Sequence, residues 1–227
     1  MTQQKHPTYR CAAWCLLTIV TLAASVPAWA QSNSWACGDL KSHYGPFDYR
    51  TSRGERLDTV ERYHFTPEVE ALIRGKSSIH IGQDLGYTLG TFPNHHRALM
   101  STMLYGRKLK SPQPPDLKYS VECFFQRALR FRPDDTTARM IYAMFLTAND
   151  RAPEAMRELE RVEKEAADNP FTSYNLGLIY LDLREYNKAL QLAHKAMAQG
   201  FVQTGLRDRL QLAGKWQDPE ERPTAVK

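Results

Sequence analysis

The stretch "SYNLGLIYLDLREYNKALQLAHKA", Ser173–Ala196, decides the fold, because its apolar residues recur at the three- and four-residue spacing of two consecutive helices. Leu176 and Tyr180 share one face of the first helix. Gly177 on the first helix and Ala189 on the second are small enough to let the two helices approach closely. The stretch therefore predicts a helix-turn-helix unit.

The same pattern recurs upstream at a fixed spacing. Ala155 follows Val121 at the same interval at which Ala189 follows Ala155, and the small residues Ala143 and Gly177 are separated by that interval too. A fixed period of this length indicates stacked copies of one supersecondary unit. We therefore expect an all-α fold built from repeated helix pairs.

The period and these small residues resemble the tetratricopeptide repeat (TPR), a helix-turn-helix unit of about 34 residues. The resemblance covers roughly residues 94–201 and implies a short solenoid of about three TPR-like helix pairs. The first pair departs from the pattern, because "KSPQPPD", Lys110–Asp116, adds about six residues to the period. Its three prolines forbid a helix, so we expect a protruding loop there. After Phe201, "TGLRDRLQLAGKW" predicts a C-terminal capping helix in which Leu206, Leu210, Leu212 and Trp216 cover the end of the stack.

The first thirty residues have the pattern of a secretory signal peptide. Lys5 and Arg10 precede an apolar run, 12–26, and Ala28–Trp29–Ala30 forms an A-x-A end. An uncleaved anchor is the alternative, although the run is shorter than the about 20 residues a spanning helix needs. We therefore expect a periplasmic or secreted protein without stable membrane insertion after cleavage. The predicted domains are a signal peptide (1–30), an irregular N-terminal arm (31–92), a helical repeat domain with its capping helix (93–216) and a flexible tail (217–227).

The arm contains one short predicted helix and one loop. "TPEVEALIRG", from Thr66, has a capping threonine, a proline at the first helical position and a closing glycine. "KSSIHIGQDLGYTLG", from Lys76, contains three glycines and is expected to be a loop with at most a short strand or helical turn.

Cys37 and Cys123 are the cysteines left after signal cleavage. An oxidising compartment favours a disulfide between them. The alternative is a buried thiol at Cys123 and an unrelated Cys37.

Charge and motifs exclude several functional classes. The formal net charge is +5, but acidic residues are interspersed with the basic ones, so we expect no nucleic-acid partner. The sequence contains neither GxSxG nor HExxH, and "GRKLK", 106–110, lacks the full phosphate-loop pattern. We expect no cofactor and no catalytic residue.

The adjacent histidines His95 and His96 follow Asn94, which we expect to cap the first repeat's opening helix. On a helix the two rings point about a hundred degrees apart, so they cannot readily chelate one ion together. We expect one to pack against the arm and the other to face water. The alternative is a metal- or small-ligand-dependent protein, perhaps an enzyme, with a site between the arm and the first repeat that also uses His64 or His80.

The TPR resemblance implies a noncatalytic scaffold or adaptor that binds a protein or peptide of the cell envelope on a concave surface. The candidate groove residues are Arg139, Tyr142, Tyr174 and Asn175. Asn175 is the strongest candidate, because an asparagine before Leu-Gly in such repeats often bonds a peptide backbone. The aromatic stretch "GPFDYR", Gly45–Arg50, is a second possibility as an internal ligand, or else it only anchors the arm.

Overall fold

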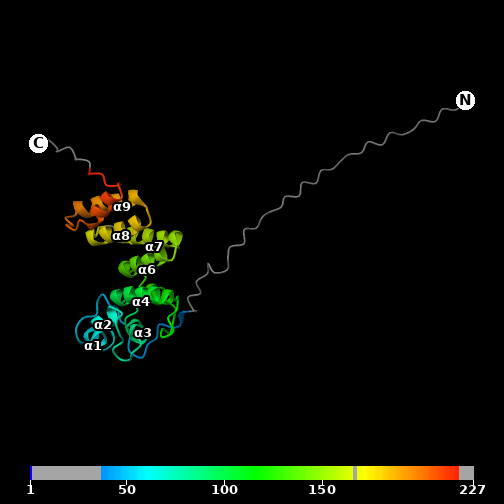
Figure 1. Ribbon diagram of the computed structural model, residues 1–227, viewed down its shortest axis with the longest axis vertical. Helices are drawn as coiled ribbons and strands as arrows, with labels where there is room; N and C mark the ends of the chain where they lie inside the picture. The colour runs from blue at the N-terminus through cyan, green and yellow to red at the C-terminus, as the bar shows by residue number, and fades with distance from the viewer. Residues whose placement is uncertain (2–36, 166–167, 220–227) are drawn as a thin grey trace. The chain divides into compact units, whose positions relative to one another are not determined.

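Helices make up all the regular secondary structure in the residues that the computed structural model describes, which are Met1, 37–165 and 168–219 (Figure 1). The expected all-α class is confirmed. The predicted signal peptide, after Met1, and the last eight residues of the predicted tail lie outside the described residues. In chain order the helices are α1 (Glu55–His64), α2 (Pro67–Glu70), α3 (Ile81–Thr91), α4 (His96–Leu109), α5 (Val121–Phe131), α6 (Thr136–Ala148), α7 (Ala152–Glu165), α8 (Pro170–Asp182), α9 (Tyr186–Ala198) and α10 (Gly205–Leu212).

Neighbouring helices pair in sequence order. α6 packs on α7 and α8 packs on α9, while α4, α6 and α8 contact one another in succession (Figure 1). The interval from the start of α6, Thr136, to the start of α8, Pro170, equals the interval from the start of α7 to the start of α9. It is also the interval between the small residues Ala143 and Gly177. The spacing of small and apolar residues in the sequence therefore corresponds to a spacing of whole helices.

α10 closes the end of this row by packing on α8 and α9. Leu206 and Leu210 are buried, as a capping helix requires. A Cβ placed on Gly177 would clash with Leu206 Cδ2, so the glycine lets α8 and α10 pack this closely. Leu212, which was also expected to cover the end, is 91% exposed, because two positions beyond Leu210 it lies on the opposite side of the helix.

The N-terminal arm is not irregular as predicted, because it contains three helices. In α3, Ile81, Leu85 and Leu89 recur every four residues, and all three are buried. Each such side chain contributes about 1.5–3 kcal/mol on burial. Each glycine of this helix costs about 1 kcal/mol relative to alanine, so burial outweighs the weak helix propensity. α2 is shorter than the predicted helix and ends before Leu72, which adopts a φ of 57°.

The connection before α4 has the same backbone bonding as the one before α6. Phe92 N–H donates to the carbonyl of Thr88, and His95 N–H donates to that of Phe92. Before α6, the N–H groups of Arg132 and Asp135 make the equivalent two bonds. The connection from α3 to α4 therefore has the same form as the connection from α5 to α6. The row of helices begins with α3, before residue 93, where the sequence predicts the start of the repeat domain.

The proline-rich segment after α4 folds back instead of protruding. Leu117 is buried in the main core. Asp116 Oδ2 accepts hydrogen bonds from Gly82 N at 2.7 Å and from the Tyr105 hydroxyl at 2.9 Å. Burial and the bond to Asp116 raise the pKa of Tyr105 to about 12. The segment therefore ties the first turn of α3 to α4.

The predicted Cys37–Cys123 disulfide is present, with an S–S distance of 2.08 Å and a sequence separation of 86 residues. Closing a loop of this length stabilises the fold by about 4 kcal/mol in the chain-entropy model. Arg127 Nη1 adds hydrogen bonds to the carbonyls of Cys37, at 2.9 Å, and Asp39, at 2.6 Å. The start of the described chain is thus fixed to α5.

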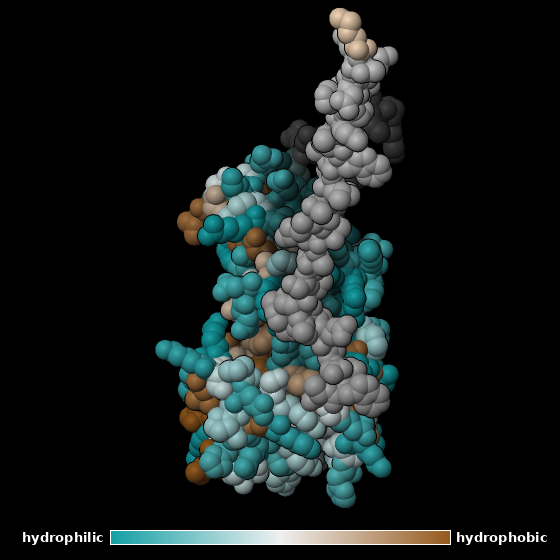
Figure 2. All heavy atoms as spheres, turned by 90° about the vertical axis from the view of Figure 1, so that its right-hand side faces the viewer, coloured by the Kyte–Doolittle hydropathy of each residue, from teal (hydrophilic) through white to brown (hydrophobic). Residues whose placement is uncertain are grey.

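Most of the described surface on one face of the molecule is hydrophilic, with hydrophobic residues in separate patches (Figure 2). Among the described residues, no helix is long and apolar enough to cross a membrane.

Candidate functional site

His95 is the N-cap of α4, and its side chain is completely buried. Its Nδ1 accepts the backbone N–H of Ala98 at 3.1 Å. That bond leaves the ring proton on Nε2, which donates to Glu61 Oε1 at 3.1 Å. Tyr49 stacks on the ring with 4.1 Å between centroids. Burial lowers the pKa of His95, so a neutral imidazole joins α1 to α4 and anchors the arm.

Asn94 does not cap this helix, contrary to the prediction, because its side chain is used between distant segments. The residue is fully buried. Its Oδ1 accepts the backbone N–H of Tyr49 at 3.0 Å. Its Nδ2 donates to Asp48 Oδ1 at 2.8 Å and to Asp135 Oδ2 at 2.7 Å. One amide therefore links the arm to the start of α6.

His96 is held by a carboxylate and is not free in water. Its Nε2 lies 2.9 Å from each oxygen of Asp135, and its side chain is 21% exposed. Asp135 also accepts from Ala138 N at 3.0 Å as the N-cap of α6. Burial alone would raise the pKa of Asp135, but the hydrogen bond and charge of His96 with the other bonds hold it below its usual value.

Asp48 is the other acidic centre of this junction. Arg50 Nη2 and Arg132 Nε each lie 2.8 Å from Asp48 Oδ2. The hydrogen bonds from Arg50 hold the pKa of Asp48 well below its usual range. We call Asp48, Asn94, His96 and Asp135, with these arginines, the junction network. Each member has a partner within the chain, so the network fixes the arm in place and offers no obvious ligand position.

His64 and His80 lie apart from the junction network. His64 Nδ1 is 3.0 Å from Asp84 Oδ1, and its ring stacks on Tyr87 with 3.7 Å between centroids. Asp84 is fully buried and also accepts the N–H of Lys76 at 2.6 Å. The Ser77 hydroxyl bonds this carboxylate and not the imidazole, so the three groups do not form a nucleophile–base pair. His80 is exposed at the start of α3.

The candidate histidines are not gathered around one point. His95 and His96 contact different carboxylates, Glu61 and Asp135, while His64 contacts Asp84. Within residues 37–165 and 168–219, no group of three or more His, Cys, Asp or Glu side chains is arranged to hold a metal ion. The geometry of the described residues gives the metal-site alternative no support.

Two of the expected groove residues are buried. Arg139 is 5% exposed, and its Nη1 donates to Glu158 Oε2 of α7 at 2.5 Å. Tyr142 is 8% exposed, and its hydroxyl donates to Glu122 Oε1 of α5 at 2.7 Å. Both side chains therefore join α6 to neighbouring helices and present little surface to a partner.

The other two expected groove residues lie on α8 and are half-buried. Tyr174 packs against Phe201, with 4.8 Å between ring centroids. Asn175 Nδ2 donates to the carbonyl of Phe171 one turn earlier at 2.8 Å. Asn175 shares a helix face with Phe171, which is 56% exposed, and with the half-buried Leu178. Of the four predicted residues, Asn175 retains the clearest surface position.

A hollow of about 320 Å³ lies between the C-terminal halves of α4 and α6, and we call it the α4–α6 hollow. Apolar side chains supplied by both helices and by the start of α5 line it, including Met103, Val121 and Phe145. Arg107 and Lys110 are exposed among its lining residues and form no ion pair within the described residues. These cations belong to "GRKLK", 106–110, whose pattern does not match a phosphate loop. Most of their apolar neighbours come from α5 and α6, far along the chain, so no local pattern reveals the hollow.

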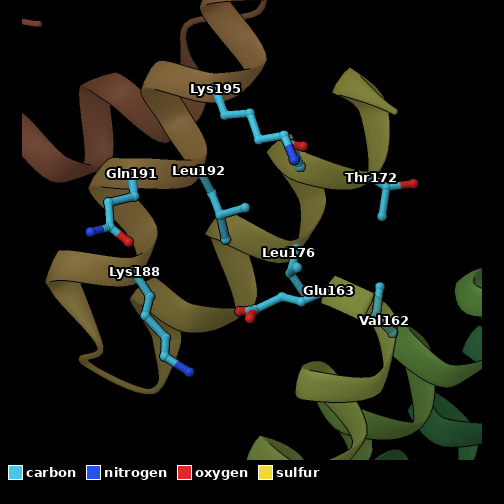
Figure 3. Close-up of a pocket in the computed structure, with 9 residues that line it drawn as sticks. Val162, Glu163, Thr172, Leu176, Lys188, Gln191, Leu192 and Lys195 are labelled. Atoms are coloured by element: carbon cyan, nitrogen blue, oxygen red, sulfur yellow. The ribbon is translucent and has the colours of Figure 1, made fainter. Parts of the chain in front are cut away.

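A second hollow, of about 330 Å³, lies among α7, α8 and α9. Figure 3 shows Glu163 extending from α7 toward α9, where Lys188, Gln191 and Lys195 line the wall. Burial raises the pKa of Tyr180, and its hydrogen bond with Glu163 raises it further. Lys188 Nζ lies 3.5 Å from the same hydroxyl. The polar groups of this hollow thus support the helix packing.

In comparisons with known proteins, no family model matches this chain, and no curated protein or solved structure is significantly similar to it.

Proposed function

We propose that the protein is a noncatalytic scaffold or adaptor of the cell envelope that binds a protein segment along α4, α6 and α8. In this proposal the helix pairs are TPR-like repeats. The equal spacing of the helix starts, from α6 to α8 and from α7 to α9, supports it. The small residues Ala143 and Gly177 support it further, since both are buried at equivalent positions of α6 and α8.

The observation that carries the binding proposal is the α4–α6 hollow. Its apolar lining can accept one aliphatic or aromatic side chain, whose burial contributes about 1.5–3 kcal/mol. Arg107 and Lys110 can attract a carboxylate, at about 0–1 kcal/mol for each exposed pair. An apolar residue flanked by acidic residues is the partner sequence that this surface fits best.

The hollow alone does not supply a stable complex. The contributions above sum to less than the about 8 kcal/mol of a micromolar complex. The partner must therefore also contact the rest of the face. Met144 on α6 precedes Leu178 on α8 by the interval that separates the two helix starts, and both side chains are half-buried, so the same face continues along the row. We propose that the bound segment runs from the hollow to Asn175.

The Cys37–Cys123 disulfide supports a periplasmic or secreted location, because disulfides persist in oxidising compartments. The proposed signal peptide agrees with that location.

The proposal is tested with two labelled peptides, the wild-type protein and two variants. One peptide carries Leu-Phe after two aspartates, and the other carries Leu-Phe after two lysines. We expect the acidic peptide to bind more tightly, and Arg107→Glu/Lys110→Glu to reverse that preference. Lys164→Glu, an exposed lysine on α7, is the charge control. Equal binding of both peptides by the wild type would contradict the proposed hollow.

The extent of the bound segment is tested separately. Proteins of the envelope are captured with the wild type and with Asn175→Ala. We expect the variant to lose or weaken a partner that the wild type retains. If the variant captures the same partners as the wild type, and salt weakens their capture equally in both, Asn175 is not part of the proposed surface.

A further inference from the structure

A third cavity, of about 470 Å³, lies beside α3, and we call it the α3 cavity. This volume falls within the range of about 300–1,000 Å³ that small-molecule sites occupy. Its walls are one face of α3, the segment 39–43 of the arm, and the segment from Asp116 to Arg127. The cavity shares no lining residue with the α4–α6 hollow.

Two glycines of α3 line this cavity without a packing reason. A Cβ on Gly86 would meet nothing within 4 Å, and one on Gly90 would meet only Ser42 Oγ at 3.8 Å. Gly82 differs, because a Cβ there would lie 2.5 Å from Asp116. Interior glycines weaken a helix, and they are used where another molecule or backbone approaches closely. The helix thus exposes a strip of bare backbone to the cavity at positions 86 and 90.

Aromatic and cationic groups line the same cavity. Tyr119 lines the cavity, with Arg127 Cζ 4.7 Å and Lys118 Nζ 5.2 Å from its ring centroid. Arg127 is 4% exposed, and its Nε–H has no acceptor among the described residues. A buried guanidinium that is not fully satisfied favours an anion nearby.

The lining of the cavity has an excess of positive charge, because it contains the cations Lys41, Lys118 and Arg127 and two carboxylates. Lys41 and Lys118 are exposed lining residues that form no ion pair within residues 37–165 and 168–219. Asp116 is one of the carboxylates, and its Oδ2 accepts from Gly82 N and the Tyr105 hydroxyl, while its buried Oδ1 has no donor among the described residues. Asp39 is the other carboxylate, and it accepts from Lys41 N at 3.1 Å.

We propose that the α3 cavity binds a planar aromatic anion. The ring lies between the bare backbone at Gly86 and Gly90 and the Tyr119 side chain. The anionic group faces Lys41 and Lys118, with the Arg127 guanidinium behind it. This site is independent of the proposed peptide-binding face and uses none of its residues.

Two fluorescent probes with one ring system test the proposal. 8-Anilino-1-naphthalenesulfonate is an aromatic anion with a planar naphthalene ring, and N-phenyl-1-naphthylamine is the same ring system without the sulfonate. We expect the wild type to bind the sulfonate at one site and more tightly than the neutral amine. Lys41→Glu/Lys118→Glu should weaken sulfonate binding about five- to tenfold, by reversing two contacts with the anion, and leave binding of the amine unchanged. Lys164→Glu is the charge control.

The glycine strip is tested with Gly86→Leu and Gly86→Ala. Leucine should abolish binding of both probes, while alanine should weaken it and raise the thermal midpoint of unfolding, since alanine favours the helix. Circular dichroism checks that both variants are folded, and the alanine variant keeps the test valid if leucine disrupts the fold. Unchanged sulfonate affinity in a folded glycine variant would overturn the site.

The experiments distinguish failure of the α3 site from failure of the proposed peptide-binding face. Loss of sulfonate binding in Arg107→Glu/Lys110→Glu, with normal binding in the Gly86 variants, would place the probe in the α4–α6 hollow and overturn the α3 site. Normal binding of the acidic peptide by Gly86→Leu is expected, because the peptide face does not include α3.

Discussion

Asn94 donates a hydrogen bond to Asp48 at 2.8 Å, although the two residues are 46 positions apart. The same amide nitrogen donates to Asp135 at 2.7 Å. Two carboxylates that would repel each other are thereby held near one donor. The amide is a central element in docking the arm.

Replacing that amide should destabilise the protein in a graded way. Asn94→Ala removes one hydrogen bond from each carboxylate and leaves the Tyr49 N–H without its acceptor, which should cost about 1–3 kcal/mol. Asn94→Asp puts a third carboxylate beside Asp48 and Asp135 and should cost about 3–5 kcal/mol. Urea unfolding measures both. Asn175→Ala is the control, because its amide bonds only its own helix, and it should change stability by less than about 0.5 kcal/mol. Equal effects at positions 94 and 175 would contradict the role of the junction network.

Stability should fall as the pH is lowered below about 6.5, the ordinary value for histidine. Burial lowers the pKa of His95 in the folded state, so the unfolded state takes up the proton first. Folding is then progressively penalised until the pH reaches the folded-state pKa. His95→Asn retains a residue that can cap α4 but does not titrate. Its unfolding free energy should fall less between pH 7 and pH 5 than that of the wild type. Urea unfolding at several pH values measures the difference, and an unchanged slope would contradict the role of His95.

Stability should fall a second time at lower pH, when Asp48 and Asp135 take up protons. The pKa values of Asp48 and Asp135 are lowered in the folded state, so their contribution is complete above the ordinary value near 3.8. It is lost as the pH falls through the lower folded-state values. In Asp135→Asn the acid-induced decrease between pH 4 and pH 2 should be smaller than in the wild type. An unchanged acid profile would show that this carboxylate is not coupled to folding.

Reduction of the disulfide should lower stability by about 2–4 kcal/mol without loss of the helices. The mass of the oxidised chain should rise by about 2 Da on reduction, as two sulfurs each take up a hydrogen. Cys37→Ala/Cys123→Ala should unfold at the denaturant concentration of the reduced wild type. Two free thiols in protein purified under oxidising conditions would contradict the pairing.

The contact between Gly177 and Leu206 should appear as an energetic coupling. Gly177→Ala forces a Cβ against Leu206 Cδ2 and should cost about 1–3 kcal/mol. Leu206→Ala removes a buried side chain and should cost about 2–5 kcal/mol. The double variant should be more stable than the sum predicts, because the clash and the cavity offset each other. Leu212→Ala, at an exposed position, should have little effect. If the cost of the double variant equals the sum of the two single costs, the two residues are not in contact.

Local patterns predicted the paired helices from α6 to α9, because their apolar periodicity and their partners lie within one unit of sequence. α3 was missed because its three glycines conceal the four-residue spacing of Ile81, Leu85 and Leu89. The burial of those residues depends on helices elsewhere in the chain, which a propensity argument does not weigh.

The candidate site was less predictable, because the sequence assigns a residue to a helix but not to a neighbour. Arg139 was expected to line a groove, yet Glu158 holds it against α7. Likewise, the partners of His95 and His96 lie 34 and 39 positions away, so the pair "HH" alone cannot indicate them.

The disulfide and the junction network have a consequence for the order of events in folding. Arg50 bonds Asp134 across 84 positions, and Arg127 bonds Cys37 across 90. During synthesis the arm residues Cys37 and Arg50 are made first. Their partners Arg127 and Asp134 are made much later. The pairs α6–α7 and α8–α9 need only local contacts and can form quickly, but docking of the arm involves slow, distant closure. Until α5 has been synthesised, Cys37 cannot pair with Cys123, and Asp48 lacks its contact with Arg132.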